Sequence, residues 1–493
     1  MPVFIIRYSE IGLKGPRKRS EMERRLVKNI SSALSEPSEM RIWRERGRIF
    51  LEVPGNLRTL ASENLATVFG IKSFSECKVV TFNSIEELIN ISVDHFAPFT
   101  KSRTFAVRAT RTGHHAFTSI EIERKLGEAL FPESSGVNLE EPEYTARLDI
   151  RENKAYLYNS VLKGPGGFPL GTQGRMVSLV SGGIDSPVAA WMMMKRGSIQ
   201  DIVFCSLAHP IDTLEFLTVL EPLLSKWSHG ADITIHMFNG SRLVEAMALG
   251  QGFVHPNVGF KKFLYELADR VNSSINGYGI VTGESLGQVS SQTAENLSAL
   301  SISAGIPIFR PLIGFDKDEI VDLSKRIGTF PETSLGEFCS IFSSNPSLTI
   351  SQDDLEKDEI PEKDMQAILE TEIIIRKKDF ADYIEKLRKG FRHTEPTIEG
   401  ALLVDLRSED KFRSWHPAGS IHASLGEVSS LPEKYGRNRT YLFYCSKGLM
   451  SAYAASKLGS MGINAMFTDE WKLKKVIDGN PIKSECLRKN ILK

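Results

Sequence analysis

The sequence around residue 180 places the strongest constraint on the fold. The apolar segment Val177-Ser-Leu-Val180 runs directly into Ser181-Gly-Gly-Ile-Asp-Ser186, and a helical pattern over 187–196 follows. A glycine turn between a buried strand and a helix N-terminus presents backbone N–H groups to an anion. We therefore expect a phosphate-binding loop in an α/β domain.

The segments that follow alternate between strand and helix patterns. Strands are expected over 176–180, 201–207, 232–238, 279–282 and 307–310, and helices over 187–196, 211–228, 259–276 and 291–303. This alternation predicts a doubly wound parallel sheet, which binds its ligand at the carboxyl ends of the strands. Leu179 and Val180 end the first strand, and Phe204 and Cys205 end the second, so their backbones are expected to bracket an adenine and ribose. Cys205 is interpreted as a wall of this site and not as a nucleophile.

The phosphate loop lacks the lysine of the Walker motif GxxxxGK[ST]. Gly182 and Gly183 allow the backbone to approach phosphate, while Ser181 and Ser186 add hydroxyl donors. A loop of this kind suits enzymes that release pyrophosphate and keep AMP. The pattern SGGxDS, with Asp185 in it, resembles the PP-loop of the ATP pyrophosphatase superfamily.

Length and composition indicate a soluble protein of several domains. The 493 residues are too many for one core and suggest about three domains. No run approaches the roughly 18 apolar residues of a membrane span, and the start of the chain reads as a strand and not as a signal peptide. The five scattered cysteines form no CxxC pair, which argues against a structural zinc site or a disulfide framework and favours the cytoplasm.

The N-terminal region has the charge of an RNA-binding surface. Residues 1–50 contain 12 Lys and Arg against 6 Asp and Glu. In the strand expected over 104–111, Phe105 and Val107 are predicted to oppose a polar row of Arg108, Thr110 and Arg111. The residues expected to contact RNA are Arg103, Arg108, Arg111 and Lys125, beside His114, His115 and Phe117. The two histidines are not expected to bind metal, because no third ligand accompanies them.

Four longer segments together resemble the tRNA 4-thiouridine synthetase family. They are Gly171-Thr-Gln-Gly174, the stretch SGGIDSPVAAWMMMKRG, Val281-Thr-Gly-Glu-Ser-Leu-Gly-Gln-Val-Ser-Ser-Gln292 and Arg310-Pro-Leu-Ile-Gly-Phe-Asp-Lys317. The resemblance covers essentially the whole chain. It implies a ferredoxin-like α+β domain over 1–58, a THUMP RNA-binding domain over 59–165, a PP-loop ATP pyrophosphatase domain over 172–345, a linker over 346–397 and an α/β rhodanese domain over 398–482.

The resemblance also implies a nucleotide site and a reaction. Lys261, Gly283 and Gln292 would line the ATP site, and Lys317 would stabilise charge during adenylation. The residues themselves support Gly283, which follows an expected strand, whereas Asp316-Lys-Asp-Glu also reads as the start of a helix. The implied reaction uses ATP with Mg²⁺ to adenylate a tRNA uridine, at position 8 in the family, and yields 4-thiouridine.

A cysteine near the C-terminus repeats the geometry of the phosphate loop. The strand Tyr441-Leu-Phe-Tyr444 runs into Cys445-Ser-Lys-Gly-Leu-Met-Ser451 and a helix, so backbone N–H groups, the helix dipole and Lys447 should stabilise a persulfide anion on Cys445. Asp405-Leu-Arg407 and His416-Pro-Ala-Gly419 match the opening pattern of rhodaneses. Many rhodaneses have arginine where Met450 stands, which disfavours thiosulfate and fits a cysteine persulfide donor.

The resemblance assigns a role to one further cysteine and leaves an alternative open. In the family, the cysteine at the place of Cys339 forms a disulfide with the rhodanese cysteine during turnover. The expected partners are tRNA, a cysteine desulfurase or other persulfide donor, and a thiol reductant. The alternative is sulfur transfer to a small carrier protein in thiamine thiazole biosynthesis. A non-catalytic RNA-binding protein is a further reading, disfavoured by the intact Asp185, Ser186 and Cys445.

Overall fold

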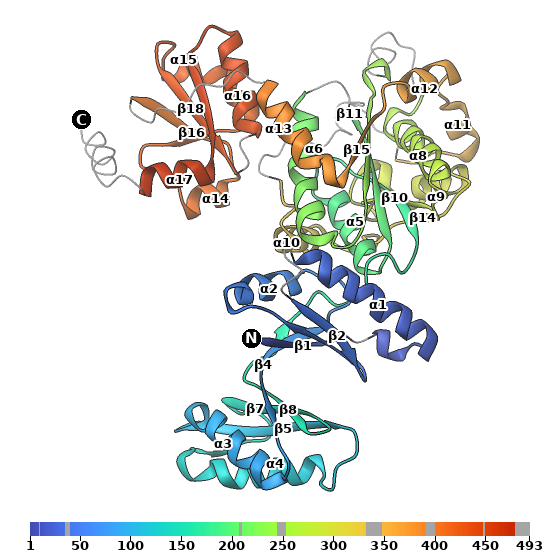
Figure 1. Cartoon of the computed structure of the whole chain (residues 1–493). Helices are drawn as coiled ribbons and strands as arrows, with labels where there is room; N and C mark the ends of the chain where they lie inside the picture. Colours follow the sequence, from blue (N-terminus) through green and yellow to red (C-terminus); the bar gives the residue numbers. More distant parts are fainter. Residues whose placement is uncertain are drawn as a thin grey trace. The chain divides into compact units, whose positions relative to one another are not determined.

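The structure of the chain is a computed structural model, drawn in Figure 1, that describes residues 1–8, 10–34, 40–206, 210–243, 253–331, 348–390, 400–446 and 449–478. The chain divides into two compact units. The first comprises residues 1–173 with the short segments 194–198 and 229–231, and the second comprises the remaining residues.

The first unit is built on one continuous nine-stranded sheet in the order β2-β3-β1-β4-β8-β7-β5-β6, with β9 paired to β4. The strands are β1 (Val3–Arg7), β2 (Arg41–Glu45), β3 (Arg48–Glu52), β4 (Ser73–Thr81), β5 (Thr104–Thr112), β6 (Gly136–Val137), β7 (Tyr144–Arg151), β8 (Lys154–Tyr158) and β9 (Leu162–Lys163). The long strand β4 pairs with β1 through its first residues and with β8 through its last ones. It therefore joins an N-terminal and a central half of the sheet.

Two pairs of helices cover the sheet of the first unit. In Figure 1, α1 (Pro16–Ala33) and α2 (Arg58–Leu65) lie above the strands of the N-terminal half, while α3 (Ile85–Thr100) and α4 (Ser119–Leu130) lie below those of the central half. In α4 the buried residues Ile122, Leu126 and Leu130 recur at four-residue spacing, which gives the helix one apolar stripe. The helix-free faces of the two halves turn towards each other, since Phe50 of β3 packs on Tyr156 of β8 with ring centroids 4.7 Å apart.

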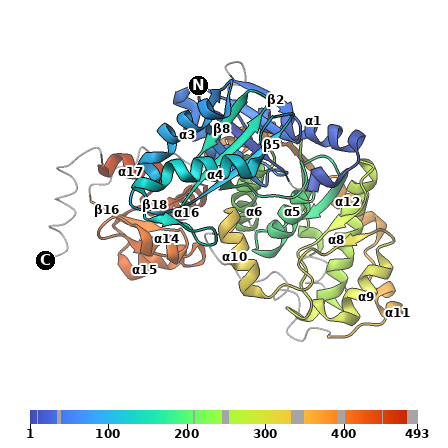
Figure 2. The same cartoon turned by 90° about the horizontal axis from the view of Figure 1, so that it is seen from below.

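The second unit contains the doubly wound sheet that the sequence predicts. Its strands are β10 (Arg175–Leu179), β11 (Ile199–Ser206), β12 (Thr234–Asn239), β13 (Ile280–Val281), β14 (Ile308–Phe309) and β15 (Ile373–Arg376), in the order β14-β13-β10-β11-β12-β15. The first five are parallel. In Figures 1 and 2, α5 (Asp185–Lys195) and α6 (Pro210–Pro222) lie on one side, and α8 (Pro256–Ser274) and α9 (Ala294–Ser303) on the other.

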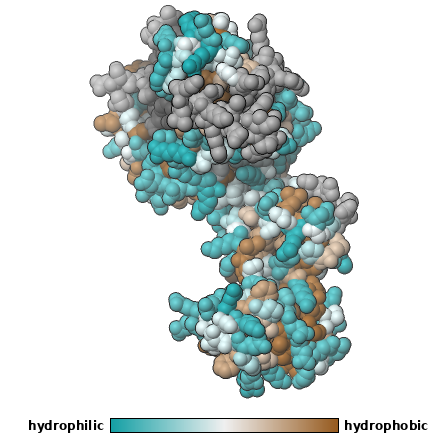
Figure 3. Space-filling model, turned by 90° about the vertical axis from the view of Figure 1, so that its left-hand side faces the viewer, coloured by the Kyte–Doolittle hydropathy of each residue, from teal (hydrophilic) through white to brown (hydrophobic). Residues whose placement is uncertain are grey.

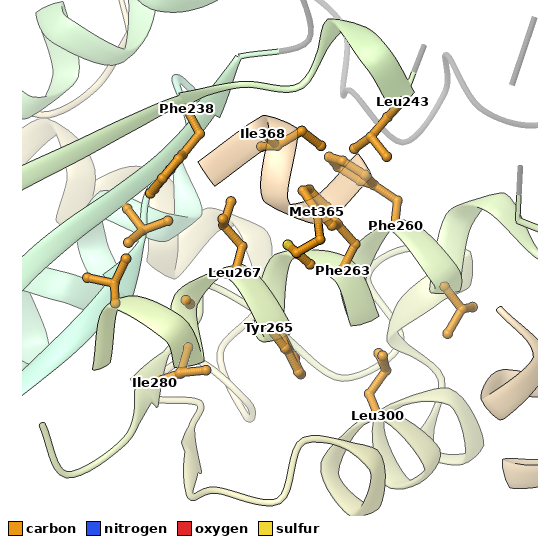
Figure 4. Packing of buried hydrophobic residues seen from close by; sticks show 14 of the residues in the cluster. Phe238, Leu243, Phe260, Phe263, Tyr265, Leu267, Ile280, Leu300, Met365 and Ile368 are labelled. Atoms are coloured by element: carbon orange, nitrogen blue, oxygen red, sulfur yellow. The ribbon is translucent and has the colours of Figure 1, made fainter. Parts of the chain in front are cut away.

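The sequence treats 346–397 as a linker, but much of this stretch is packed against the parallel sheet. It forms α11 (Gln352–Lys357), α12 (Glu362–Leu369), the antiparallel edge strand β15 and α13 (Phe380–Gly390). Figure 4 shows Met365 and Ile368 of α12 directed into the same cluster as Phe238, Phe260 and Phe263. The segment looks like a linker because it is rich in acidic residues. Its few apolar residues nevertheless form a stripe, which is enough to cover one edge of the core. Residues 332–347, which contain the expected boundary at 345, lie outside the described residues.

The C-terminal part of the second unit is a small parallel sheet in the order β17-β16-β18-β19. Its strands are β16 (Ala401–Asp405), β17 (Ile421–His422), β18 (Thr440–Cys445) and β19 (Ala465–Asp469), and its helices are α14 (Glu409–Ser414), α15 (Leu431–Tyr435), α16 (Leu449–Ser460) and α17 (Glu470–Asp478). Leu403, Leu442 and Met466 contribute to a core of its own.

The surface is mixed in character. On the coloured part of the face in Figure 3, hydrophobic residues form separate patches between hydrophilic ones. None of the helices in the described ranges is both long enough and apolar enough to span a membrane.

Candidate functional site

The phosphate-type loop lies between β10 and α5, at the carboxyl edge of the parallel sheet. The backbone N–H of Ser181 donates to the Ser186 hydroxyl at 2.9 Å, and the N–H of Gly183 lies 3.3 Å from the Ser181 hydroxyl. The two serine hydroxyl oxygens are 3.2 Å apart. Backbone donors and hydroxyl groups are thus gathered at the N-terminus of α5, which is a suitable arrangement for phosphate oxygens.

Two glycines of this site are required by close packing. A Cβ on Gly182 would come within 2.8 Å of the Cβ of Glu215, on α6. A Cβ on Gly283 would lie 2.6 Å from the backbone nitrogen of Ser186. Gly283 therefore allows the segment after β13 to rest directly on the first turn of α5, which brings two predicted nucleotide-site segments together.

The carboxylate of Asp185 is contacted from two other segments. Lys317 Nζ lies 2.8 Å from Oδ1 and 3.1 Å from Oδ2 of Asp185, and Gln288 Nε2 donates to Oδ2 at 2.8 Å. Lys317 begins α10 (Lys317–Ile327), and Gln288 belongs to the loop after β13. The sequence singled out Asp185 and Lys317 separately, but it gave no role to Gln288, which only its contact with Asp185 identifies.

The segment around Lys317 begins a helix, as the pattern Asp316-Lys-Asp-Glu predicted, and it also brings Lys317 to Asp185. Asp316 caps α10, and its side chain and that of Glu319 form a capping box. Lys317 is the first residue of this helix, where a positive charge is unfavourable because of the helix dipole. The ion pair with Asp185 offsets this cost and directs the ammonium group towards the loop.

A buried ionic cluster lies beside the loop after β13. Glu284 accepts hydrogen bonds from Lys261 at 2.9 Å, Arg310 at 2.7 Å, Tyr265 at 2.7 Å and Thr282 at 3.0 Å. Burial alone would raise the pKa of Glu284, but the charges of Lys261 and Arg310 outweigh it and lower this pKa to about 2. Glu284 is therefore an anion that fixes Lys261, the lysine predicted to line the ATP site.

Arg310 is held in place independently of Lys261. Its guanidinium also donates to the Ser301 hydroxyl at 2.8 Å and to Tyr265 at 3.2 Å. Because Arg310 neutralises Glu284, Lys261 retains positive charge for a ligand. Sequence reasoning quoted Arg310 and Glu284 only as parts of motifs and missed this cluster, whose members come from α8 and from the segments that follow β13 and β14.

The other residues predicted to line the nucleotide site lie in the loop after β13 or at the ends of β10 and β11. Gln292 Oε1 accepts from the backbone N–H of Ser285 at 3.0 Å and so fixes the loop that carries Gln288. Val180 N donates to Val203 O at 3.0 Å, which places Leu179 and Val180 at the strand end. Phe204 is buried against Phe216, with centroids 4.1 Å apart.

The thiol of Cys205 is not activated as a nucleophile. Burial raises its pKa to about 12, so the thiol is neutral near pH 7 and is a poor nucleophile. The pKa of Cys77, for which no role is expected, is likewise raised to about 12 by burial.

The predicted RNA-binding residues are divided between two sides of the central half-sheet. Arg108 points from β5 to the helix-free face, whereas Lys125 lies on α4 and pairs with Glu86 and Glu121 at 3.5 and 3.6 Å. Arg111 does not share the row of Arg108, because successive strand residues alternate and Arg111 follows Val107 and Ala109 on the helix-covered face. Arg103 lies in the exposed turn before β5.

His115 contacts the backbone of a neighbouring turn. His115 Nε2 lies 2.8 Å from the carbonyl oxygen of Glu152, and its ring packs near Phe117. Across the described ranges, no three His, Cys, Asp or Glu residues are grouped so as to hold a metal ion.

Cys445 is the last residue of β18 and is 1% exposed. Its thiol lies 3.6 Å from the hydroxyl of Ser451, which donates in turn to the carbonyl of Thr468 at 2.8 Å. Met450, at the place of the usual rhodanese arginine, is buried. Lys447 and Cys339 lie outside the described residues.

The motif Asp405-Leu-Arg407, expected of rhodaneses, begins at the last residue of β16, the strand next to β18. Arg407 donates to Asp405 at 2.6 Å and pairs with Glu470 at 3.0 Å, all at the carboxyl edge of the small sheet. On the same edge, Lys411 Nζ donates to the hydroxyl of Ser446 at 3.0 Å, one residue from Cys445. A cation therefore contacts the residue that follows Cys445, although Met450 replaces the arginine.

Comparison with known proteins agrees with this organisation. Family models match a ferredoxin-like domain over 3–75, a THUMP domain over 81–159, "Thiamine biosynthesis protein (ThiI)" over 171–363 and a rhodanese-like domain over 384–470. The fold class expected from the sequence is confirmed.

Full-length relatives are similar over nearly the whole chain. A tRNA sulfurtransferase of Thermoplasma volcanium is 42% identical, over 96% of this chain and 97% of the relative. One of Pyrobaculum aerophilum is 37% identical, over 94% and 96% respectively. The solved structure of a 4-thiouridine synthetase–RNA complex with bound ATP is 28% identical, with a TM-score of 0.62, over 76% of this chain and 99% of that one. The chain therefore belongs to the tRNA sulfurtransferase family.

Proposed function

We propose that this chain is an ATP-dependent tRNA uridine 4-sulfurtransferase that adenylates a uridine and then replaces its O4 with sulfur carried by Cys445. The convergence of Lys317 and Gln288 on Asp185 at the phosphate-type loop is the observation that carries this proposal. This contact brings an ammonium group, which can stabilise developing negative charge, to a nucleotide-binding loop. Members of the family are named for sulfur transfer to tRNA.

The first step is activation of the uridine. The O4 of the uridine, at position 8 in the family, attacks the α-phosphorus of ATP, and the bond to pyrophosphate breaks. The backbone N–H groups of residues 181–183 and the Lys317 ammonium group stabilise the charge that develops on the phosphate oxygens. Lys261, fixed by Glu284, supplies a second cation to the nucleotide. The products are pyrophosphate and a uridine whose C4 carries AMP as a leaving group.

The second step is transfer of sulfur. The terminal sulfur of a persulfide on Cys445 attacks C4, and AMP leaves with the former O4. The thiolate of Cys339 then attacks Cys445 Sγ, the sulfur–sulfur bond to the nucleoside breaks, and 4-thiouridine leaves with the electron pair. The resulting Cys339–Cys445 disulfide takes two electrons from a thiol reductant before the next cycle.

The reaction implies further partners. ATP would bring Mg²⁺ bound to its phosphates, since divalent cations usually bind such sites through substrate phosphates and only one or two carboxylates. Sulfur would come from a cysteine desulfurase or another persulfide donor, in the cytoplasm. The N-terminal unit would bind tRNA, in line with the RNA and ATP named for the solved relative.

A second candidate is favoured by the description of the matching family model, which names thiamine biosynthesis. In this reading, the persulfide on Cys445 delivers sulfur to a small carrier protein for the thiazole ring. The rhodanese-like sheet has a core of its own, which is compatible with a separate sulfur-transfer role.

Nucleoside mass spectrometry tests the proposal. The full-length protein, unmodified tRNA, ATP and a cysteine persulfide donor should yield 4-thiouridine, with one AMP and one pyrophosphate per thiolated uridine. Asp185→Asn and Cys445→Ser should yield none. If pyrophosphate release were independent of tRNA and only a carrier protein gained sulfur, the second candidate would replace the first.

A further inference from the structure

A row of arginines crosses the helix-free face of the first unit. In the register of the sheet, Arg108 of β5 is the partner of Arg147 of β7, and Arg147 is the partner of Tyr158 of β8. The guanidinium carbon of Arg7, on β1, lies 4.6 Å from the centre of the Tyr158 ring. Arg108, Arg147, Tyr158 and Arg7 therefore follow one another across the sheet.

The arginine row lacks countercharges. Two like charges directly opposite each other on adjacent strands destabilise a sheet. Arg108 donates to the carbonyl oxygens of Val107 at 3.2 Å and Leu139 at 2.7 Å, and Arg147 donates to that of Thr145 at 3.3 Å. Among the described residues, no carboxylate lies within ion-pair distance of either arginine, so backbone carbonyls orient these charges without neutralising them.

Arg7 is packed at the end of this row. Its Nη1 donates to the Ser75 hydroxyl at 3.0 Å, its Nη2 is buried, and its guanidinium lies against the ring of Tyr158, which is 7% exposed. Arg7 therefore has a structural role between β1 and β8 and offers no accessible donor to a macromolecular ligand.

Neighbouring arginines on the same face are paired, which sets the row apart. Arg48 and Arg151 share the buried carboxylate of Asp149, at 3.4 and 2.8 Å. Arg151 also donates to the carbonyl of Glu45 at 2.9 Å. These contacts hold the two halves of the sheet together, and a structural role accounts for them. No such role accounts for the charges of Arg108 and Arg147.

We propose that Arg108 and Arg147 form a site for backbone phosphates of the RNA substrate. The site deepens the proposed function and rests on it. Guanidinium groups recognise phosphate with paired hydrogen bonds, and groups mounted on paired strands lose little freedom on binding. Such contacts position the RNA without reading its sequence.

Lys125 and Arg108 carry the same charge but differ in their contacts. Lys125, on the helix-covered side, is already paired with two glutamates and lies outside the site. Arg108 is common to the site and to the set predicted from sequence, whereas Arg147 is new. An acidic peptide of a protein partner is the rival occupant. It is disfavoured because the solved structure similar to this chain is named as a complex of a 4-thiouridine synthetase with RNA.

The test compares two double variants of the full-length protein. Arg108→Gln with Arg147→Gln removes two charges from the row, and Arg58→Gln with Arg124→Gln removes two exposed charges that pair with Glu76 and Glu128. Dissociation constants for unmodified tRNA are measured between about 50 and 200 mM salt. The first variant should bind at least about tenfold more weakly, and the slope of log K against log salt should fall by roughly 1.4 to 1.8, for two phosphate contacts. The second variant should bind within about threefold of wild type.

Further arms separate the possible failures. Arg108→Lys with Arg147→Lys should recover most of the affinity, and melting temperatures within a few degrees of wild type would show that all variants are folded. An unchanged salt slope for the glutamine variant, with wild-type thiolation intact, overturns the site and leaves the proposed function standing. Loss of binding to an acidic peptide but not to tRNA would assign the row to a protein partner. Failure of the wild type to bind tRNA at low salt overturns both proposals.

Discussion

Lys317 contacts both carboxylate oxygens of Asp185, at 2.8 and 3.1 Å, although 132 positions separate the two residues in the sequence. One begins the helix α10 and the other the helix α5, so two helix N-termini meet at the carboxyl edge of the sheet. Gln288 completes the arrangement from a third segment. The pair holds an ammonium group ready beside the loop where phosphate charge would develop.

Replacement of Lys317 by methionine should impair adenylation and leave RNA binding intact. Loss of one preorganised group that stabilises transition-state charge costs about 2.7 kcal/mol or more, or on the order of 10²-fold in rate. The rate of tRNA-dependent pyrophosphate release measures this loss. Lys325→Met, in the last turn of the same helix, serves as the control, and an equal loss in both variants would argue against a specific role for Lys317.

Replacement of Glu284 by glutamine should weaken ATP binding, because Lys261 and Arg310 would lose their shared anion. Removal of one partner from a buried ionic group costs about 3 to 5 kcal/mol of stability. We expect KM for ATP to rise about tenfold, with a smaller change in kcat. Glu266→Gln, on the exposed side of α8, is the control. A normal KM in the folded Glu284 variant would rule out positioning of Lys261.

The same substitution should change the pH dependence of stability. The folded-state pKa of Glu284, about 2, lies below its ordinary value of 4.5. Ionised Glu284 therefore stabilises the fold fully above about pH 4.5, and this contribution of about 3 kcal/mol is lost as the pH falls towards 2. The difference in unfolding free energy between wild type and Glu284→Gln, from urea titrations at several pH values, should shrink across this window. A difference that stays constant with pH would contradict the assignment.

Truncation of Ile368 should show that α12 belongs to the nucleotide-binding core. Ile368 is 0% exposed in the cluster of Figure 4, whereas Ile374 on β15 is 57% exposed. Ile368→Ala should lower the free energy of unfolding by about 2 to 5 kcal/mol. The matched change Ile374→Ala should alter it by about 0.5 kcal/mol or less. Equal effects in denaturant titrations would mean that the segment acts only as a connector.

Substitution of each of the two cysteines proposed to transfer sulfur should stop the reaction at a different step. Cys445→Ser should accept no sulfur from a persulfide donor, because a hydroxyl cannot form a persulfide. Cys339→Ser should load sulfur on Cys445 and then stall without the thiol that resolves the intermediate. Peptide mapping without reductant after a single turnover should recover a Cys339–Cys445 disulfide, whose Cα atoms must come within about 7 Å. Recovery of Cys205 or Cys77 adducts alone, with Cys339 free, would refute the pairing.

The sequence by itself determined the features that depend on contiguous residues. The loop at Ser181–Ser186, the end of β18 at Cys445 and the start of α16 soon after it were predictable, because strand, turn and helix patterns follow one another directly and each has a local chemical signal. The doubly wound sheet followed from the alternation of strands and helices, and the structure confirms it with one added antiparallel strand. The family resemblance rested on motifs of the same local kind.

Only the tertiary structure decided which distant side chains meet. Gln288 reaches Asp185, and Arg310 shares Glu284 with Lys261, because parallel strands bring loops remote in sequence to one edge of the sheet. The packing of α12 depended on whether a sparse apolar stripe would find a partner, which no local pattern reveals. The arginine row depended on strand register. The sequence shows that each residue is basic, but only the pairing of the strands shows which side chains lie next to it and whether a carboxylate is among them.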